Sequence, residues 1–381
     1  MRFEASEEQA QIRDMVRSLA RKEFAPKAAQ IDEEGRYPEE NLKRLAELGL
    51  LGMLVPASHG GSETGTVAYA IALAEVAGGC ASTAVGMAVT NMVGEGIHRF
   101  GSEEQRSRFL PALASGTVTG AFALTEPSAG SDAFGISTVA LRDGDAYVLN
   151  GSKVFITNGS RAGVTIVMAV TEKEPKKRIS AFLVLPGMPG FSVGKPEHKM
   201  GLKGSDTVSL SFGDCRVPKR NLLGAEGEGF PIAMTILDGG RIGIASQSVG
   251  IARAALDAAT SYARERRQFG EPIASFQAIQ GMLADSATEL DAAELLALRA
   301  AYRKDAGAPF TREASVAKVF ASEAAYRACH RSVQVFGGYG YIREYPVERH
   351  LRDIKVTSIY EGTSEIQRII IARDLLGQGR R

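Results

Sequence analysis

A carboxylate in an unusual local setting stands near the C-terminal end of the sequence, in the segment IYEGTSEIQR at residues 359–368. Glu361 lies there between Tyr360 and Gly362, whose backbone is free to turn sharply. The next residues have the composition of a helix N-terminus: Thr363, Ser364 and Glu365. Glu361 lies outside this helix N-terminus, so helix capping does not explain it. A carboxylate that is removed from water can act as a general base, which is one interpretation of Glu361. The competing interpretation is a solvated loop carboxylate, the common state of an isolated glutamate.

Two segments in the middle of the chain carry hydroxyl groups and aromatic rings. FALTEPSAGSD, residues 122–132, is small and polar, so its backbone N–H groups could bind a phosphate. KVFITNGS, residues 153–160, places Phe155 and Thr157 on one face of a strand, where they could stack on a flat ring and hydrogen-bond to it. A surface loop and a half-buried strand are the simpler interpretations. No GxGxxG follows a strand, so a Rossmann-type site is not predicted.

Three glycine- or arginine-rich segments stand where helices end or are interrupted. RERRQFG, residues 264–270, has clustered arginines, which suit phosphate groups but also helix C-termini. QVFGGYGY, residues 334–341, has paired glycines, which allow tight termination or the close approach of a ligand. LDGGR, residues 237–241, puts two glycines into or beside a helical pattern. Each costs about 1 kcal/mol there relative to alanine, so we expect something to need the space, such as a ligand.

The elements that must position these residues change in type along the chain. The N-terminal part is helical: Ser6 and Gln9 form a capping-box pattern, and leucines from Leu42 onward mark a helix that ends before Gly49. A third helix ends at Gly78-Gly79. Short β-like runs begin near residue 121. Asn150-Gly151 predicts a two-residue hairpin turn, buried strands are predicted at 164–170 and 179–185, and a further β-like run at 210–218 closes this part.

Helical periodicity returns near Phe230 and continues to the C-terminal end of the chain. Long helices with short links predict a bundle, with helices at 232–264, 277–306, 312–335 and 363–376. We therefore expect a helical domain over residues 1–120, a β domain over 121–228 and a helical bundle over 229–381. No linker-like segment separates them.

The composition limits the classes of function. The 45 basic and 44 acidic residues give a net charge of +1, which argues against a nucleic-acid-binding protein. The three cysteines are far apart, as in a reducing compartment, and the five histidines show no metal-ligand spacing. The polar N-terminus does not look like a secretory signal, and no run is long enough to span a membrane. A cytoplasmic protein without a metal is expected.

The chemistry-bearing segments, taken in order, strongly resemble the acyl-CoA dehydrogenase family over essentially the whole chain. They are FALTEPSAGSD, NGSKVFITNG, LDGGRIGIASQ, RERRQFG, QVFGGYGY and IYEGTSEIQR. Short-chain, butyryl-type members are the most similar. The resemblance implies an α+β fold: an N-terminal helical domain, a middle β-barrel-like or β-sandwich domain and a C-terminal four-helix bundle. It also implies FAD as cofactor, an acyl-CoA substrate in fatty acid β-oxidation, an electron-transfer flavoprotein as acceptor, and a homotetramer built as a dimer of dimers.

The resemblance implies two sets of FAD contacts. One set would come from the β domain: Phe122, Leu124, Thr125, Gly130, Ser131, Phe155, Ile156 and Thr157. The other would come from a neighbouring chain or from the last helix: Arg266, Phe269, Gln277, Gln334, Val335, Gly337, Gly338, Thr363, Ser364 and Glu365. Many relatives have tryptophan at the position of Phe155. Phenylalanine can still stack there, but it lacks the indole N–H.

In the same resemblance, Glu361 is the base that removes the proton α to a thioester while a hydride leaves the β-carbon for flavin N5. The product is a trans-2-enoyl-CoA. The substrate would contact Ser131, Asp238, Arg241, Tyr360 and Gly362. Isovaleryl- and long-chain-type relatives carry the base at the position of Gly240. Glycine there assigns the base to Glu361 and favours a short straight or lightly branched acyl group.

Three alternatives stay open at this point. The first is an acyl-CoA oxidase or a nitroalkane-oxidase-like enzyme that passes electrons to oxygen, although the latter would carry aspartate as the base. The second is a flavin-bearing nucleic-acid-binding protein of the same superfamily, which the balanced charge disfavours. The third is a purely structural helical protein that binds no flavin.

Overall fold

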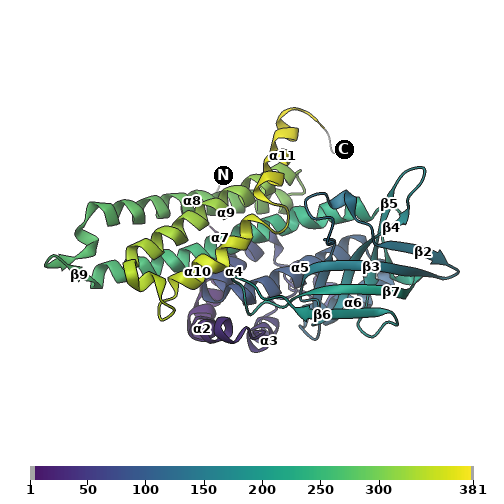
Figure 1. The fold of residues 1–381 in the computed structure, drawn as a ribbon, viewed down its shortest axis with the longest axis horizontal. Helices are drawn as coiled ribbons and strands as arrows, with labels where there is room; N and C mark the ends of the chain where they lie inside the picture. The colour runs from purple at the N-terminus through teal and green to yellow at the C-terminus, as the bar shows by residue number, and fades with distance from the viewer. Residues whose placement is uncertain (1–4, 379–381) are drawn as a thin grey trace.

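The computed structural model describes residues 5–378, and it has helices at both ends of the chain with a β-sheet between them (Figure 1). The N-terminal part begins with the predicted capping box, in which Ser6 accepts a hydrogen bond from the backbone N–H of Gln9. A π-helical turn, Ala20–Phe24, joins the first two helices. The helices of this part are α1 (Glu7–Leu19), α2 (Ala25–Glu34), α3 (Glu39–Glu47), α4 (Gly65–Gly79), α5 (Ala81–Phe100) and α6 (Glu103–Ala114).

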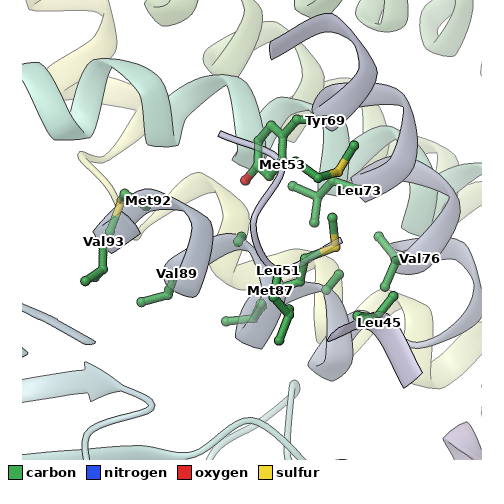
Figure 2. Packing of buried hydrophobic residues seen from close by; sticks show 14 of the residues in the cluster. Leu45, Leu51, Met53, Tyr69, Leu73, Val76, Met87, Val89, Met92 and Val93 are labelled. Carbon is green, nitrogen blue, oxygen red and sulfur yellow. The ribbon is translucent and has the colours of Figure 1, made fainter. Parts of the chain in front are cut away.

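The N-terminal helices share a hydrophobic core around α4 and α5. Both helices are apolar on nearly all sides, as expected for helices that are buried by neighbours on several faces. Figure 2 shows side chains of this core, among them Leu73 and Val76 of α4, Met87 of α5 and Leu51. The same core includes side chains of the sheet and of the C-terminal helices, so all three parts of the chain pack against it.

The β part is one eight-stranded sheet with the order β6-β7-β3-β2-β4-β5-β8, and β1 pairs with β4 outside that path. The two predicted buried strands are confirmed as β4 and β5, and the β-like run at 210–218 lies in β7. Parallel pairing of β1 with β4 places the end of β1 beside the middle of the sheet. The strands are β1 (Thr119–Ala123), β2 (Val139–Asp143), β3 (Ala146–Thr157), β4 (Ala162–Glu172), β5 (Arg178–Val184), β6 (Phe191–Pro196), β7 (Thr207–Pro218) and β8 (Leu222–Leu223).

The predicted hairpin turn at Asn150-Gly151 is wrong, because β3 runs through both residues without turning. The register between β3 and β7 shifts there, and Gly151 has a φ of 147°. The glycine therefore forms a β-bulge, which needs the same backbone freedom as a hairpin turn. The side chain of Asn150 bonds to Asp214 on β7, with its Nδ2 3.1 Å from Oδ1, and so holds the bulge against the neighbouring strand.

The C-terminal part is a bundle around α7, a helix of 37 residues. The predicted long helices are confirmed, and LDGGR lies inside α7. One helix of this part, α10, was not predicted from the sequence. Its eight residues are too few to show a clear helical repeat of apolar residues. The elements are α7 (Gly229–Glu265), β9 (Arg267–Gln268), β10 (Glu271–Pro272), α8 (Gln277–Asp305), α9 (Thr311–Phe336), α10 (Val347–Ile354) and α11 (Ser364–Leu375).

The sequence predicts neither a membrane-spanning helix nor a metal site, and the structure describes residues 5–378. No helix in that range has the length and apolar character that a bilayer crossing requires. No group of three or more histidine, cysteine, aspartate or glutamate side chains in that range could hold a metal ion. The three cysteines, Cys80, Cys215 and Cys329, are free thiols and buried.

Candidate active site

Glu361 lies in a tight turn between α10 and α11, beside the middle of α7. Its φ is 52° and that of Gly362 is 90°, so two successive residues have left-handed backbone. A non-glycine residue in this conformation costs on the order of 1–2 kcal/mol, and such strain is kept where the surrounding structure fixes it. The turn thus holds Glu361 in an orientation that a relaxed loop would not adopt.

The carboxyl of Glu361 points at a gap in α7. A Cβ added to Gly240 would overlap with Oε2 of Glu361. Oε2 is inaccessible to solvent and has no hydrogen-bond partner within the described part of the chain. Burial raises the pKa of Glu361 to about 7, against the opposing effect of the cations Arg241 and Lys318. The competing interpretation of Glu361 as a solvated loop carboxylate does not fit this position. The space left by the glycine in LDGGR is filled by the Glu361 carboxyl and not by a ligand.

Hydrogen bonds hold the Glu361 turn from two helices. Lys318 on α9 donates from Nζ to the carbonyl oxygen of Gly362 at 2.7 Å. Gln367 on α11 donates from Nε2 to the same oxygen at 2.9 Å. Thr363 is the N-cap of α11, accepting from the backbone N–H of Ile366 at 3.3 Å. Three donors from two helices therefore fix the backbone on the C-terminal side of Glu361.

The other predicted substrate contacts lie close to this turn. The hydroxyl of Tyr360 donates to Gln247 Oε1 on α7 at 2.7 Å, which fixes the ring. Asp238 and Arg241 on α7 form a buried ion pair. Asp238 also accepts a hydrogen bond at 2.6 Å from Thr311, at the start of α9. The polar residues Asp238 and Arg241 therefore flank Gly240 along α7.

The predicted flavin loop follows β1 and is fastened to β3. The backbone N–H of Val154 donates to the carbonyl of Thr125 at 3.0 Å. Below it, the buried Lys153 donates from Nζ to the carbonyl of Leu124 at 3.0 Å and to Glu126 Oε1 at 2.7 Å. Phe122 and Thr125 are half-buried, whereas Gly130 and Ser131 are exposed further along the loop. The structure thus brings residues 122–125 next to residues 153–157.

Phe155 is presented to solvent by a second irregularity in β3. The register with β7 shifts between Lys153 and Ile156, and Phe155 has a φ of 60°. Its ring is 66% exposed, which is unusual for an aromatic side chain inside a strand. Thr157 is half-buried, but the side chain of Ile156 is only 2% exposed and packs in the sheet core. Ile156 therefore presents no side chain to a ligand on this face.

A second group of predicted cofactor residues surrounds a hollow of about 580 Å³ at the other end of the bundle. Arg266 and the backbone of Gly337 and Gly338 line it, and the Arg266 guanidinium lies 5.4 Å from the centre of the Tyr339 ring. A Cβ at either glycine would meet no atom within 4 Å, so the backbone faces open space. Val335 is 4% exposed at its wall. Exposed residues nearby complete the predicted set: Phe269, Gln277 and Gln334.

The two groups of predicted cofactor residues are far apart in one chain. Figure 1 shows β9, next to Arg266, at one end of the molecule and the sheet with β3 at the other. The chain therefore does not bring the two groups together by itself. Ser364 is 5% exposed and Glu365 is exposed, and both lie in the first turn of α11, directly after Glu361.

Some residues of the site were not predicted from the sequence. Lys318 shares the buried face of α9 with Ala314, Ala317 and Ala321, so a lysine at a periodic core position was a signal that could have found it. Tyr69 on α4 is 3% exposed and lies close enough to Glu361 for the charges of the two groups to interact. Gln367 had no sequence signal, because it lies in an ordinary helical turn.

Comparison with known protein families gives matches along nearly the whole chain. Residues 6–117 match the acyl-CoA dehydrogenase N-terminal domain, residues 121–215 the middle domain and residues 227–376 the C-terminal domain. A probable acyl-CoA dehydrogenase, YngJ of Bacillus subtilis, is 51% identical over 99% of this chain and 100% of its own length. The mitochondrial short-chain specific acyl-CoA dehydrogenase of Rattus norvegicus is 49% identical over 98% of this chain and 91% of its own length.

Solved structures agree with these matches. Butyryl-CoA dehydrogenase from Megasphaera elsdenii superposes with a TM-score of 0.96 at 44% identity, covering 99% of this chain and 100% of that one. A chain described with the electron transferring flavoprotein of Acidaminococcus fermentans gives 0.97 at 45% identity, covering 99% and 100%. A glutaryl-CoA dehydrogenase from Mycobacterium smegmatis in complex with FADH2 gives 0.94 at 32% identity, covering 99% and 97%.

The helical, β and helical parts and their relatives define a flavoprotein oxidoreductase. The chain belongs to the acyl-CoA dehydrogenase family, whose members depend on FAD.

Proposed function

We propose that this enzyme oxidises a short straight or lightly branched acyl-CoA to the trans-2-enoyl-CoA, with Glu361 as the base that takes the α-proton. The observation that carries this proposal is the Oε2 atom of Glu361, which is buried and has no hydrogen-bond partner among residues 5–378. It lies against Gly240, where a side chain on α7 would overlap with it. A carboxylate in water is a weak base, whereas burial raises the pKa of Glu361 to about 7. That value lies in the range where a general base is most effective.

The main chain of Glu361 can assist the same step. Removal of the α-proton puts negative charge on the thioester oxygen, and a donor already in place stabilises it. Within residues 5–378 the backbone N–H of Glu361 has no hydrogen-bond acceptor. Gly362 has no side chain to block the approach of a thioester to this N–H. One residue would therefore supply both the base and a donor, and the left-handed turn would set the angle between them.

The residues present suit FAD at two places. The exposed ring of Phe155 and the hydroxyl of Thr157 offer a stacking surface and a hydrogen-bonding group for a flat heterocycle. Arg266 and the open backbone at Gly337 and Gly338 offer a cation and bare N–H groups for a pyrophosphate. When FAD is bound, it supplies the acceptor for the hydride from the β-carbon of the substrate.

The separation of these two places supports an oligomer in which neighbouring chains share each FAD. One chain would contribute the Phe155 face and another the Arg266 hollow, in a homotetramer built as a dimer of dimers. Analytical ultracentrifugation together with the FAD content of each species tests this. FAD should be found only in oligomers, and Arg266→Ala should lower FAD retention without changing the fold. A flavin-loaded monomer would contradict it.

The preference for a short acyl group rests on similarity and on Gly240. The relatives include short-chain and butyryl-CoA dehydrogenases. The position that holds the base in isovaleryl- and long-chain-type relatives is glycine here, and the structure leaves no room for a second carboxylate beside Glu361. An electron-transfer flavoprotein is the proposed electron acceptor.

The test is anaerobic flavin bleaching by a panel of acyl-CoAs from butyryl to palmitoyl, with isobutyryl and 2-methylbutyryl included. Butyryl-CoA or a lightly branched homologue should bleach fastest. Glu361→Gln should keep FAD and still bind the thioester, but it should bleach at least about a hundredfold more slowly. Bleaching at the wild-type rate would overturn the assignment of the base. Slow reoxidation of the reduced enzyme in air would exclude the oxidase alternative.

A further inference from the structure

Lys318 is a buried cation with no conventional structural explanation. Its side chain is fully buried on α9, in a stripe whose other members include Ala314, Ala317 and Ala321. A lysine is almost never fully buried unless it is paired, because its ammonium loses solvation. Within the part of the chain that the structure describes, Lys318 makes no ion pair closer than 4.0 Å. The ammonium instead donates a hydrogen bond to the carbonyl oxygen of Gly362.

That hydrogen bond ends on the residue next to Glu361. The Nζ atom of Lys318 lies 2.7 Å from the carbonyl oxygen of Gly362, and Gln367 Nε2 lies 2.9 Å from the same oxygen. The peptide group that carries this oxygen is the first one after the left-handed pair Glu361 and Gly362. The Gly362 carbonyl is thus held by two donors from different helices: the charged ammonium of Lys318 and the neutral amide of Gln367.

Two cations, Lys318 and Arg241, lie near Glu361, and they differ in whether a carboxylate neutralises them. Facing Glu361 are Arg241 from α7, Lys318 from α9, the hydroxyl of Tyr69 from α4, and Tyr360 in its own turn. Arg241 already pairs with the carboxylate of Asp238.

Among residues 5–378, Lys318 has no carboxylate partner within 4.0 Å. Arg241 and the carboxylates Glu323 and Glu365 also act on Lys318, but Glu361 is the carboxylate with the largest electrostatic effect on it.

We propose that Lys318 is a positioning residue for catalysis, which anchors the Glu361 turn and, by its charge, favours the ionised form of the Glu361 carboxylate. This inference rests on the proposed role of Glu361 as the base. Lys318 acts through Glu361 and not through contact with substrate or cofactor. The hydrogen bond orients the turn, and the ammonium offsets part of the desolvation of the carboxylate.

The chain offers a matched pair of variants that separates the two roles. Lys318→Met removes the donor and the charge, whereas Gln367→Leu removes the neutral donor to the same carbonyl and leaves the charge. Both are compared with the wild type as FAD-loaded enzyme, by the rate of anaerobic bleaching with butyryl-CoA as a function of pH. Far-UV circular dichroism and FAD content check that each variant is folded.

Lys318→Met should move the midpoint of the pH profile upward by about one unit and lower the rate at neutral pH about tenfold. Gln367→Leu should lower the rate at every pH and leave the midpoint in place. If both variants lower the rate with no shift of the midpoint, the role of the charge is wrong. If Lys318→Met changes neither rate nor midpoint, the whole inference is wrong.

Two further variants keep the test decisive. If Lys318→Met does not fold, Lys318→Gln retains a neutral donor and should still show the upward shift, because the charge is gone. Glu361→Gln separates this inference from the proposed function. If Glu361→Gln bleaches at the wild-type rate, the base assignment itself fails. If Glu361→Gln is inactive while the Lys318 variants keep the wild-type midpoint, only the inference about Lys318 fails.

Discussion

The missing side chain of Gly240 and the carboxyl of Glu361 occupy the same place in the molecule. A Cβ at Gly240 would overlap with Oε2 of Glu361, although the two residues belong to different elements of the helical bundle. A base carried by α7 and a base carried by the 361 turn are therefore mutually exclusive. Helical glycine, which costs about 1 kcal/mol relative to alanine, is explained here by the carboxylate that it admits.

Gly240→Ala should displace the Glu361 carboxylate and lower the rate of flavin bleaching by about a hundredfold, because misplacement of a reacting group by about 1 Å has an effect of that size. FAD binding should be unchanged. The adjacent Gly239→Ala is the control, since its Cβ would meet only the flexible ends of Lys304 and Glu95, at 3.1 and 3.2 Å. Equal rates for wild type and Gly240→Ala would show that Glu361 does not act from the position seen here.

The bleaching rate should rise with pH through about 7, the value to which burial raises the pKa of Glu361. The sign follows from the chemistry, because only the ionised carboxylate can accept the α-proton. Below the midpoint the rate should fall about tenfold per pH unit. Stopped-flow bleaching under anaerobic conditions measures it. A pH–rate profile with its midpoint at about 4, the pKa range of a solvated carboxylate, would mean that Glu361 is exposed to water in the working enzyme.

Lys153→Met should destabilise the protein by about 3–5 kcal/mol, because it leaves the buried carboxylate of Glu126 without its cation. Glu126 also accepts hydrogen bonds from the backbone N–H groups of Ser137 and Thr138, so the whole flavin loop is tied to this pair. The variant should therefore hold FAD more weakly as well. Urea denaturation measures the stability.

The matched control for Lys153→Met is Lys195→Met, in which an exposed lysine of β6 is replaced. Its effect should stay within about 0.5 kcal/mol. Similar urea midpoints for the two variants would mean that the buried pair does not hold the loop.

Gly151→Val should destabilise the sheet by about 2–4 kcal/mol, since a Cβ there would overlap with Thr138 Oγ1 and the φ of 147° suits glycine. Gly213→Ala on β7 is the control, because its Cβ would meet no atom within 4 Å. Thermal unfolding followed by circular dichroism compares them. An unchanged melting temperature for Gly151→Val would show that the bulge can relax without loss.

The order of helices and strands was predictable because it depends on local patterns. Capping at Ser6, the end of α4 at Gly79 and the apolar runs of β4 and β5 can each be recognised within a short window of sequence. The hairpin at Asn150-Gly151 was predicted wrongly for the same reason. A short window shows a flexible backbone, but it does not show that β7 continues alongside and turns the flexibility into a bulge.

The candidate site was predictable only in part. The odd setting of Glu361 and the family resemblance led to the base, and the glycines of LDGGR indicated that something, such as a ligand, needed space. The resemblance linked Gly240 to Glu361 as alternative positions of the base, but it did not show that the Glu361 carboxyl itself fills the space at Gly240. Lys318 was missed although it interrupts an alanine stripe, and Ile156 was placed among the cofactor contacts although its side chain is in the sheet core.

The amino-acid sequence alone determined the succession of elements and the segments able to do chemistry, since hydrophobic period, caps and turn residues act between near neighbours. Tertiary structure alone decided that Glu361 fills the space left by Gly240, that Lys318 holds the turn, and that β9 lies at the opposite end of the molecule from the sheet with β3. Those relationships depend on the packing of α7, α9 and the 361 turn against one another, because burial, charge and exclusion of volume arise only when distant segments meet.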